Sequence, residues 1–254
     1  MKSSDLSSDS SADPELNGVR IKGSELLKSD ICIPTGSKAL DRVLDGGIHG
    51  GVLTDFYGES GSGKTQLCHQ LCVNAVNGSN DGGVAYIDTA SGFRPERLVE
   101  IAEARGLNSD SISKRVFVVS PRSVSEQLQG LEDLQKLKPI LIVLDNLIEN
   151  FLLDFQSSGS LSLRQDLLFM YLHRLSTLAI ERKIPVVVTN IVRNRLNGGM
   201  HDVEAGGSVP LHLTHVKVHL SRHGKYWTAR TVRPLPSKNA SFLIKKAGIA
   251  DLSS

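Results

Sequence analysis

Between residues 58 and 65 the chain reads Gly58-Glu59-Ser60-Gly61-Ser62-Gly63-Lys64-Thr65. An apolar segment, Val52–Tyr57, precedes this turn, and a segment with helical periodicity, Thr65–Asn77, follows it. The pattern G-x-x-x-x-G-K-[ST] in a strand–turn–helix context is typical of the phosphate-binding P-loop, or Walker A motif. Its glycines allow backbone N–H groups to turn toward phosphate oxygens, and the helix N-terminus adds partial positive charge. The sequence therefore predicts a nucleotide site, the alternative being a chance match in a glycine-rich turn.

Three side chains around the turn are expected to carry the phosphate chemistry, with ATP and Mg²⁺ as the predicted ligands. Lys64 would place its positive charge at the β- and γ-phosphates, and the Thr65 hydroxyl would ligate Mg²⁺. Asp145 follows the apolar run Ile140–Leu144, so a strand would bring it to the same sheet edge as the P-loop. There it would hold Mg²⁺ through water. An aspartate that simply begins a turn is the alternative interpretation.

Segments of strand and helix character alternate on both sides of the P-loop. Apolar strands are expected at residues 52–57, 84–88, 116–119, 140–144 and 185–190, and helices at 37–44, 65–77, 95–105, 124–137 and 163–182. Further strands are expected at 215–220, 226–232 and 241–245, while 151–162 is expected to be a connection and 194–210 a long mobile loop. Alternating strand–helix units with apolar strands predict a mostly parallel central sheet flanked by helices. The predicted fold class is therefore α/β with a C-terminal antiparallel β extension.

The composition is that of an ordinary globular protein. Of the 254 residues 40% are hydrophobic and 22% charged, and no apolar run approaches the roughly 18 residues that span a bilayer. Residues 1–29 are rich in serine and carry no secretory signal, so we expect a flexible tail followed by a single domain over residues 30–254. Three cysteines are too few for a disulfide framework. We therefore expect a soluble intracellular protein with no membrane partner.

The net charge of +2 is unevenly distributed along the chain. From Arg182 to the C-terminus there are 12 lysines and arginines against 3 acidic residues, whereas the preceding residues have 17 against 24. A basic C-terminal third on an acidic body indicates a face that binds a polyanion such as nucleic acid. Ordinary solvated surface is the alternative, since charge runs usually have that role.

Beyond the P-loop, several blocks between Thr35 and about Phe242 follow a family pattern. The blocks are TGSKALDRVLDGGI, YGESGSGKTQLCHQL, YIDTASGFRPERL, LIVLDNL, GSLSLRQDLL, IPVVVTN and HLTHVKVHL. Together they resemble the RecA/RadA recombinases, in particular the archaeal and eukaryotic branch of that family. The resemblance implies a RecA-type P-loop ATPase core that binds DNA and assembles head to tail. It implies a nucleotide site formed by the whole P-loop including Glu59, by Gln66 directly after it, and by Arg97 near the adenine.

The resemblance also implies DNA-binding residues, with single-stranded DNA as the partner. It places Arg164 in a first DNA-facing loop, and Arg193 and Arg195 at the start of a second one. His212 falls where the family has a histidine that couples the second loop to the nucleotide. Flexible basic loops suit a stretched strand, because they contact the backbone phosphates without reading the sequence.

The chain departs from the family pattern at three places. Active members have a glutamate where this chain has Ala90, and that carboxylate orients the water that attacks the γ-phosphate. They have a glutamine after Thr189-Asn190, where this chain has Ile191. Family filaments are tethered by a phenylalanine in a linker before the core, whereas the first phenylalanine here is Phe56. Self-assembly is therefore possible, but no linker phenylalanine supports it.

These departures predict that the protein binds ATP but hydrolyses it weakly or not at all. Glu59 within the P-loop is the candidate substitute for the missing glutamate, although the family often has an acidic residue there too. The predicted catalytic set is therefore Lys64, Thr65, Asp145 and Glu59.

Only about 30 residues precede the core, so the N-terminal helical domain of full-length members is expected to be missing. In this the chain is similar to a short RadB-like protein or a recombinase paralogue, which would assist a partner recombinase in recombination and repair. One alternative is a DNA-dependent ATPase that itself performs strand exchange, and another is a module that binds only protein. The expected compartment is the cytoplasm of a prokaryote or archaeon, which we favour, or the nucleus of a eukaryote.

Overall fold

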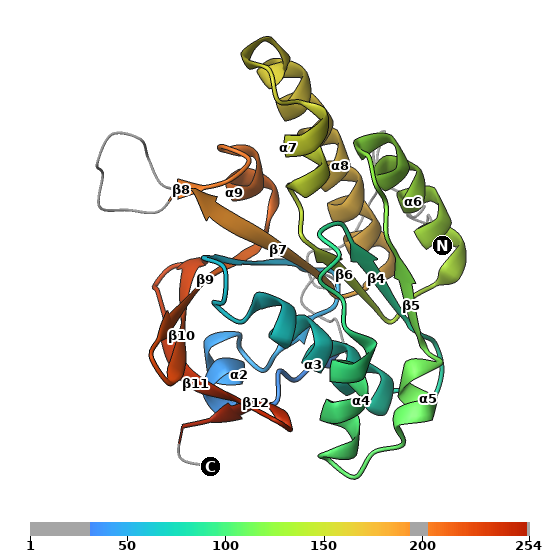
Figure 1. Ribbon diagram of the computed structural model, residues 1–254, viewed down its shortest axis with the longest axis vertical. Helices are drawn as coiled ribbons and strands as arrows, with labels where there is room; N and C mark the ends of the chain where they lie inside the picture. The colour runs from blue at the N-terminus through green and yellow to red at the C-terminus, as the bar shows by residue number, and fades with distance from the viewer. Residues whose placement is uncertain (1–30, 194–202, 253–254) are drawn as a thin grey trace, which may run out of the picture.

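A ten-stranded mixed sheet forms the centre of the computed structural model, which describes residues 31–193 and 203–252 (Figure 1). Its strands follow the order β12-β11-β10-β9-β3-β7-β6-β4-β5, and β8 pairs with β7 off this path. The parallel part contains β3 Leu53–Gly58, β4 Val84–Asp88, β5 Val116–Val119, β6 Leu141–Asp145, β7 Val186–Arg193 and β9 Val216–His223. The antiparallel part contains β8 Val203–Glu204, β10 Tyr226–Arg233, β11 Asn239–Lys245 and β12 Gly248–Asp251. Earlier in the chain, β1 Cys32–Ile33 and β2 Ile48–His49 form a separate antiparallel pair.

Helices cover both faces of this sheet (Figure 1). One group contains α2 Lys38–Val43, α3 Lys64–Asn77, α4 Pro95–Glu103 and α5 Ser109–Ser113. The other contains α6 Val124–Leu137, α7 Glu149–Asp154, the 3₁₀ turn Ser158–Ser160, α8 Leu161–Arg182 and α9 Val209–Leu213. Each group packs on an apolar core of its own, called here the α3 core and the α8 core. In the described part of the chain, no helix has both the length and the apolar character needed to cross a membrane.

Side-chain alternation along the strands separates the two cores. Val187 of β7 belongs to the α3 core, whereas Val186 and Val188 belong to the α8 core. All residues of β4 and β6 are buried, because helices cover both faces of the parallel strands. Strands β3 and β6 both run parallel to β7, so their carboxyl ends lie at the same edge of the sheet. This arrangement brings the P-loop next to Asp145.

Local sequence signals account for several helix starts. Ser37 caps α2 by accepting a hydrogen bond from the Leu40 N–H, and Ser123 caps α6 in the same way through the Glu126 N–H. Pro95 occupies the first turn of α4, where its fixed φ angle favours the helix.

The predicted α/β class with an antiparallel C-terminal extension is confirmed, and so are the predicted strands and long helices, to within a few residues. The connection predicted at 151–162 is wrong, because most of α7, the 3₁₀ turn and the start of α8 lie there and Phe151 is buried. The loop predicted at 194–210 is wrong for its second half, which contains β8 and the start of α9. Elements this short have too few residues to show a periodicity. Residues 194–202 and the predicted tail at 1–29 lie outside the described residues.

Candidate nucleotide site

The P-loop connects the end of β3 to the start of α3, as the sequence predicts. Gly58 packs directly on a neighbouring strand, since a Cβ atom there would lie 2.1 Å from the carbonyl oxygen of Leu220. Gly61 and Gly63 have φ angles of 80° and 94°, in the region that favours glycine. Among the described residues, no side chain caps the start of α3 at Gly63. The first N–H groups of this helix are therefore available to an anion.

Lys64 folds back over the P-loop. Its Nζ donates to the carbonyl oxygens of Gly58 and Glu59, each at 2.8 Å, and to Ser62 Oγ at 3.2 Å. Burial lowers the pKa of Lys64 below its usual range, while the negative charge of Asp145 acts in the opposite direction. The ammonium group thus lies inside the turn of the loop, a position that suits the predicted contact with phosphates.

The Asp145 carboxylate is held by three hydroxyl groups. Thr65 Oγ1 donates to Asp145 Oδ2 at 2.7 Å, and the Tyr86 hydroxyl donates to the same oxygen at 2.9 Å. The Thr189 hydroxyl donates to the other oxygen, Oδ1. One hydroxyl and one carboxylate at this separation fit a Mg²⁺ ion that takes its remaining ligands from phosphate and water. Sequence reasoning identified Thr65 and Asp145 but missed Tyr86 and Thr189, whose contacts depend on the strand order.

The turn after β4 lies beside this pair but carries no carboxylate at position 90. A Cβ atom on Gly92 would lie 4.0 Å from Asp145 Oδ2, which shows how close the turn approaches. Both oxygens of Asp88 are engaged in the turn itself, accepting the N–H groups of Gly92 at 2.9 Å and Phe93 at 3.0 Å. Asp88 therefore does not take the place of the glutamate that active family members have at the position of Ala90. Glu59 is exposed on the P-loop and stays the predicted substitute.

The two residues that follow Thr189 on β7 make structural contacts, one with the α8 core and one with β8 and Ala205. Ile191 pairs in register with Gly58, and its half-buried side chain packs against the α8 core. Asn190 donates through Nδ2 to Glu204 Oε1 at 2.7 Å and to the Ala205 carbonyl at 2.9 Å. The amide of Asn190 thus anchors β8, and an aliphatic group stands where the family has its glutamine.

Arg97 and Gln66 are brought together beside the P-loop helix. Arg97 Nε donates to Gln66 Oε1 at 2.7 Å, and its guanidinium also contacts the Glu100 carboxylate. The remaining donors reach the carbonyl oxygens of Lys245 at 2.7 Å and Lys246 at 2.8 Å. Arg97 therefore ties α3 and α4 to the turn between β11 and β12, and its contact with an adenine stays a prediction.

His69 is a structural residue of this site whose hydrogen bonds sequence reasoning did not predict. Its Nδ1 lies 2.7 Å from the Thr65 carbonyl, and its Nε2 lies 3.0 Å from the Arg94 backbone nitrogen. Since a carbonyl only accepts, Nδ1 carries the proton and Nε2 accepts the Arg94 N–H. The ring stacks on Phe93 at a centroid distance of 5.0 Å. His69 thus connects the P-loop helix to the start of α4.

The predicted DNA-binding residues that the structure describes belong to three different elements. Arg164 lies in the first turn of α8, not in a loop, and donates to the Phe155 carbonyl at 3.2 Å. Arg193 is the last residue of β7, and Arg195 lies outside the described residues. His212 is exposed in the last turn of α9, a helix whose Val209 packs against the α8 core. The DNA contacts of these residues stay predictions.

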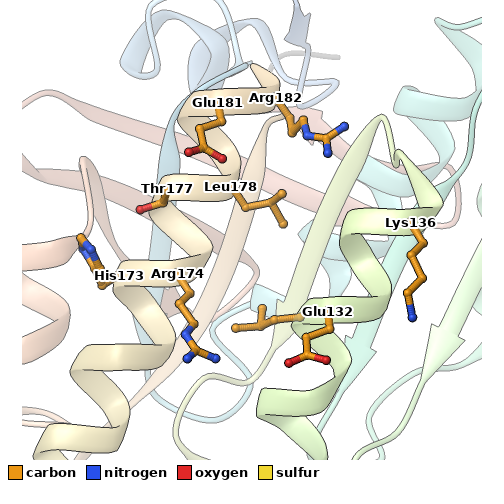
Figure 2. A pocket seen from close by; sticks show the side chains of 9 residues that line it. Glu132, Lys136, His173, Arg174, Thr177, Leu178, Glu181 and Arg182 are labelled. Atoms are coloured by element: carbon orange, nitrogen blue, oxygen red, sulfur yellow. The ribbon is translucent and has the colours of Figure 1, made fainter. Parts of the chain in front are cut away.

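A large hollow of about 820 Å³ lies between α6 and α8 (Figure 2). It is found in the C-terminal halves of both helices, which run back toward the amino ends of the parallel strands. This hollow therefore lies at the opposite end of the strands from the P-loop. Charged and polar side chains line most of it: Glu132, Lys136, His173, Arg174, Thr177, Glu181 and Arg182. It is called here the α6–α8 groove.

The outer strand β5 exposes apolar side chains at the edge of the sheet. Phe117, Val118 and Val119 are 50%, 39% and 49% exposed. Beside Val119 lies a small apolar cavity of about 50 Å³, lined in part by Ile87 and Leu134. An edge strand with exposed apolar residues is a ready template for pairing with another chain.

Comparisons with known proteins match this architecture. A family model described as Rad51 matches residues 27–252 of the chain. The chain is similar to "Meiotic recombination protein DMC1 homolog A" of Oryza sativa subsp. japonica, with 37% identity over 250 residues, covering 91% of this chain and 72% of the relative. It is also similar to "Meiotic recombination protein DMC1 homolog" of Glycine max, with 36% identity over 259 residues, covering 94% and 75%.

Proposed function

Because the chain belongs to the Rad51 family, we propose that it is an ATP-binding recombinase paralogue with weak or no ATP hydrolysis. It binds single-stranded DNA and assists homologous recombination and DNA repair by modulating a partner recombinase. The similarity to meiotic recombination proteins supports the recombination role.

One observation carries the proposal: the P-loop lysine, Thr65 and Asp145 are in place, whereas position 90 carries no carboxylate. Lys64 lies within the P-loop, and Thr65 lies within hydrogen-bond distance of Asp145. Position 90 carries a methyl group, and the nearby Asp88 uses both oxygens to hold its own turn. A methyl group neither accepts a proton nor orients water. Binding without turnover makes the nucleotide a conformational ligand that favours one arrangement of the protein.

The phosphates would be held by the N–H groups at the start of α3 and by the Lys64 ammonium group. Thr65 and Asp145 would hold Mg²⁺, which when bound neutralises charge on the β- and γ-phosphates. Tyr86 and Thr189 position Asp145 through their hydroxyl groups. Arg97 and Gln66 would form the border of the site toward the adenine.

The basic C-terminal third supports the DNA part of the proposal. Arg193 and Arg195 would contact the phosphates of a single strand, and His212 would couple that contact to the nucleotide. Phosphate contacts of this kind make binding strongly dependent on salt.

The β5 edge supports the partner part of the proposal. Its exposed apolar side chains and the adjoining cavity suit a segment of a related recombinase that adds a strand to the sheet and inserts one apolar side chain. The plant origin of the similar proteins supports the nuclear compartment over the cytoplasmic one that the sequence alone favoured.

The experiment is to measure ATP binding and ATP turnover on single-stranded DNA for the wild type beside Ala90→Glu. We expect the wild type to bind ATP with negligible turnover, and the glutamate to raise the hydrolysis rate. Lys64→Ala is the control that should abolish both signals. A wild type that hydrolyses ATP as fast as a full recombinase would contradict the proposal.

The intact set of Lys64, Thr65 and Asp145 favours a second candidate, a DNA-dependent ATPase that itself catalyses strand exchange. In that case Glu59 is the first candidate for the base. Brisk wild-type turnover that Glu59→Gln removes would establish this alternative.

A further inference from the structure

Trp227, the one tryptophan of the chain, lies on β10 against the P-loop. Its indole N–H donates to the carbonyl oxygen of Gly61 at 3.0 Å, although 166 residues separate the two. A Cβ atom on Gly63 would lie 3.4 Å from Trp227 Cδ1 and 3.0 Å from Ile244 Cδ1 on β11. The C-terminal strands therefore contact the P-loop at two of its glycines.

Neighbouring strands hold the indole ring in this position. Arg222 of β9 is its partner in register, and the guanidinium carbon lies 5.4 Å from the ring centroid, within the range of a cation–π contact. Phe242 of β11 is its partner on the other side and is fully buried. The tryptophan is thus a fixed part of the sheet, and the contact with Gly61 ties a glycine-rich loop to a rigid support.

The contact with Gly61 determines the orientation of a peptide unit that faces the phosphates. In a planar trans peptide the C=O and the following N–H point in opposite directions. Trp227 holds the Gly61 carbonyl outward, so the N–H of Ser62 points into the turn. There it donates to the Glu59 carbonyl at 3.2 Å, the same oxygen to which Lys64 Nζ donates, and a bound phosphate would replace this oxygen as the acceptor of both donors. The Ser62 N–H and the lysine thus face one region of the loop.

We propose that Trp227 is a positioning residue of the nucleotide site, which orients the Gly61–Ser62 peptide so that the Ser62 N–H faces a bound phosphate. The proposal rests on the proposed function in one respect, because it requires a nucleotide at the P-loop. It adds a residue outside the motif, on the antiparallel strand β10. It also makes the single tryptophan a direct reporter of that site.

The first test leaves the protein unchanged. Tryptophan fluorescence of the wild type is titrated with MgADP, and the same titration is followed by calorimetry. We expect an emission change that saturates with the calorimetric dissociation constant, and no change in Lys64→Ala. Calorimetric binding without any change in emission would overturn the positioning role while leaving nucleotide binding intact. Absence of calorimetric binding would overturn both this inference and the proposed function.

The second test removes the N–H and keeps an aromatic ring. Trp227→Phe should bind MgADP about three- to tenfold more weakly, the loss expected for one hydrogen bond of about 1 kcal/mol. Tyr226→Phe is the matched control, since it removes one polar group from the adjacent and more exposed residue of the same strand. Thermal unfolding without nucleotide is measured for both variants. Equal affinities of the two variants for MgADP would overturn the proposal. Weaker MgADP binding by Trp227→Phe with an unchanged unfolding midpoint would show that Trp227 positions the loop and does not merely stabilise the fold.

Discussion

Thr65 Oγ1 and Asp145 Oδ2 lie 2.7 Å apart, although 80 residues separate them in the sequence. The parallel pairing of β3 and β6 with β7 accounts for this, because it places the carboxyl ends of both strands at one edge of the sheet. Tyr86 and Thr189 donate to the same carboxylate from β4 and β7. Hydrogen bonds from α3, β4 and β7 therefore fix the Asp145 side chain.

Asp145→Asn should weaken Mg²⁺-dependent nucleotide binding by at least about tenfold, because an amide lacks the charge that attracts the ion and one acceptor oxygen is lost. Nucleotide binding measured with a chelator that removes Mg²⁺ should differ much less between this variant and the wild type. Calorimetry with and without Mg²⁺ gives both values. Asp133→Asn is the control, since that carboxylate is 61% exposed on α6. A variant that keeps the full Mg²⁺ dependence would exclude Asp145 from the metal site.

The P-loop, Thr65 and Asp145 could be predicted because their signals are local. A glycine pattern between a strand and a helix, and an aspartate after five apolar residues, each fit in a short window of sequence. The buried strands β4 and β6 could be predicted equally well, since strands covered on both faces form nearly continuous apolar runs in the sequence.

The remaining parts of the site depend on contacts between distant segments. Trp227 reaches Gly61 only because β9, β10 and β3 are neighbours in the sheet, and no local pattern contains that order. The family resemblance placed Arg164 in a loop, but the residue lies in the first turn of α8, within the helix that the apolar periodicity predicts over residues 163–182. The roles of Asn190 and Glu204 likewise follow from the pairing of β7 with β8.

Lys217→Met should destabilise the protein by about 3–5 kcal/mol, because it leaves the buried carboxylate of Asp55 and the half-buried carboxylate of Glu204 without their cation. Lys217 is 2% exposed and pairs with Asp55, which is fully buried, and with Glu204 at 2.6 Å. Burial raises the pKa of Asp55 well above its usual range, and the positive charge of Lys217 opposes that shift. The free energy of unfolding in urea provides the measurement.

Lys238→Met is the matched control for this change. Lys238 pairs with Asp45, but the two side chains are 42% and 72% exposed, so the loss should be no more than about 1 kcal/mol. Equal stabilities of the two variants would show that the buried cluster of Lys217, Asp55 and Glu204 contributes no more than a surface pair.

Stability should fall as the pH is lowered, in part through His69. Burial lowers the pKa of His69 below its ordinary value, and protonation of Nε2 would replace the acceptor of the Arg94 N–H with a donor. The unfolded state, with an ordinary pKa of about 6.5, therefore binds more protons in the window between the two pKa values. The contribution of His69 is complete above about pH 6.5 and is lost as the pH falls toward the folded-state pKa.

The measurement is urea unfolding between about pH 7.5 and about pH 5.5 for the wild type, His69→Gln and His173→Gln. We expect a smaller pH dependence in His69→Gln than in the wild type. His173 is exposed on α8, so its variant should keep the wild-type slope. Identical slopes in all three proteins would exclude His69 as a source of acid sensitivity.

Replacing Arg193 and Arg195 together with alanine should weaken binding of single-stranded DNA and reduce its dependence on salt. Each lost phosphate contact lowers the slope of log K against log salt by about 0.7, so the double variant should lose about 1.4. Arg174→Ala with Arg182→Ala removes the same charge from the α6–α8 groove and should leave the slope unchanged. If only the variant with Arg174→Ala and Arg182→Ala binds single-stranded DNA more weakly, the DNA contact lies in the α6–α8 groove. Absence of DNA binding in the wild type would favour a module that binds only protein, because the basic C-terminal third would then have no polyanion to contact.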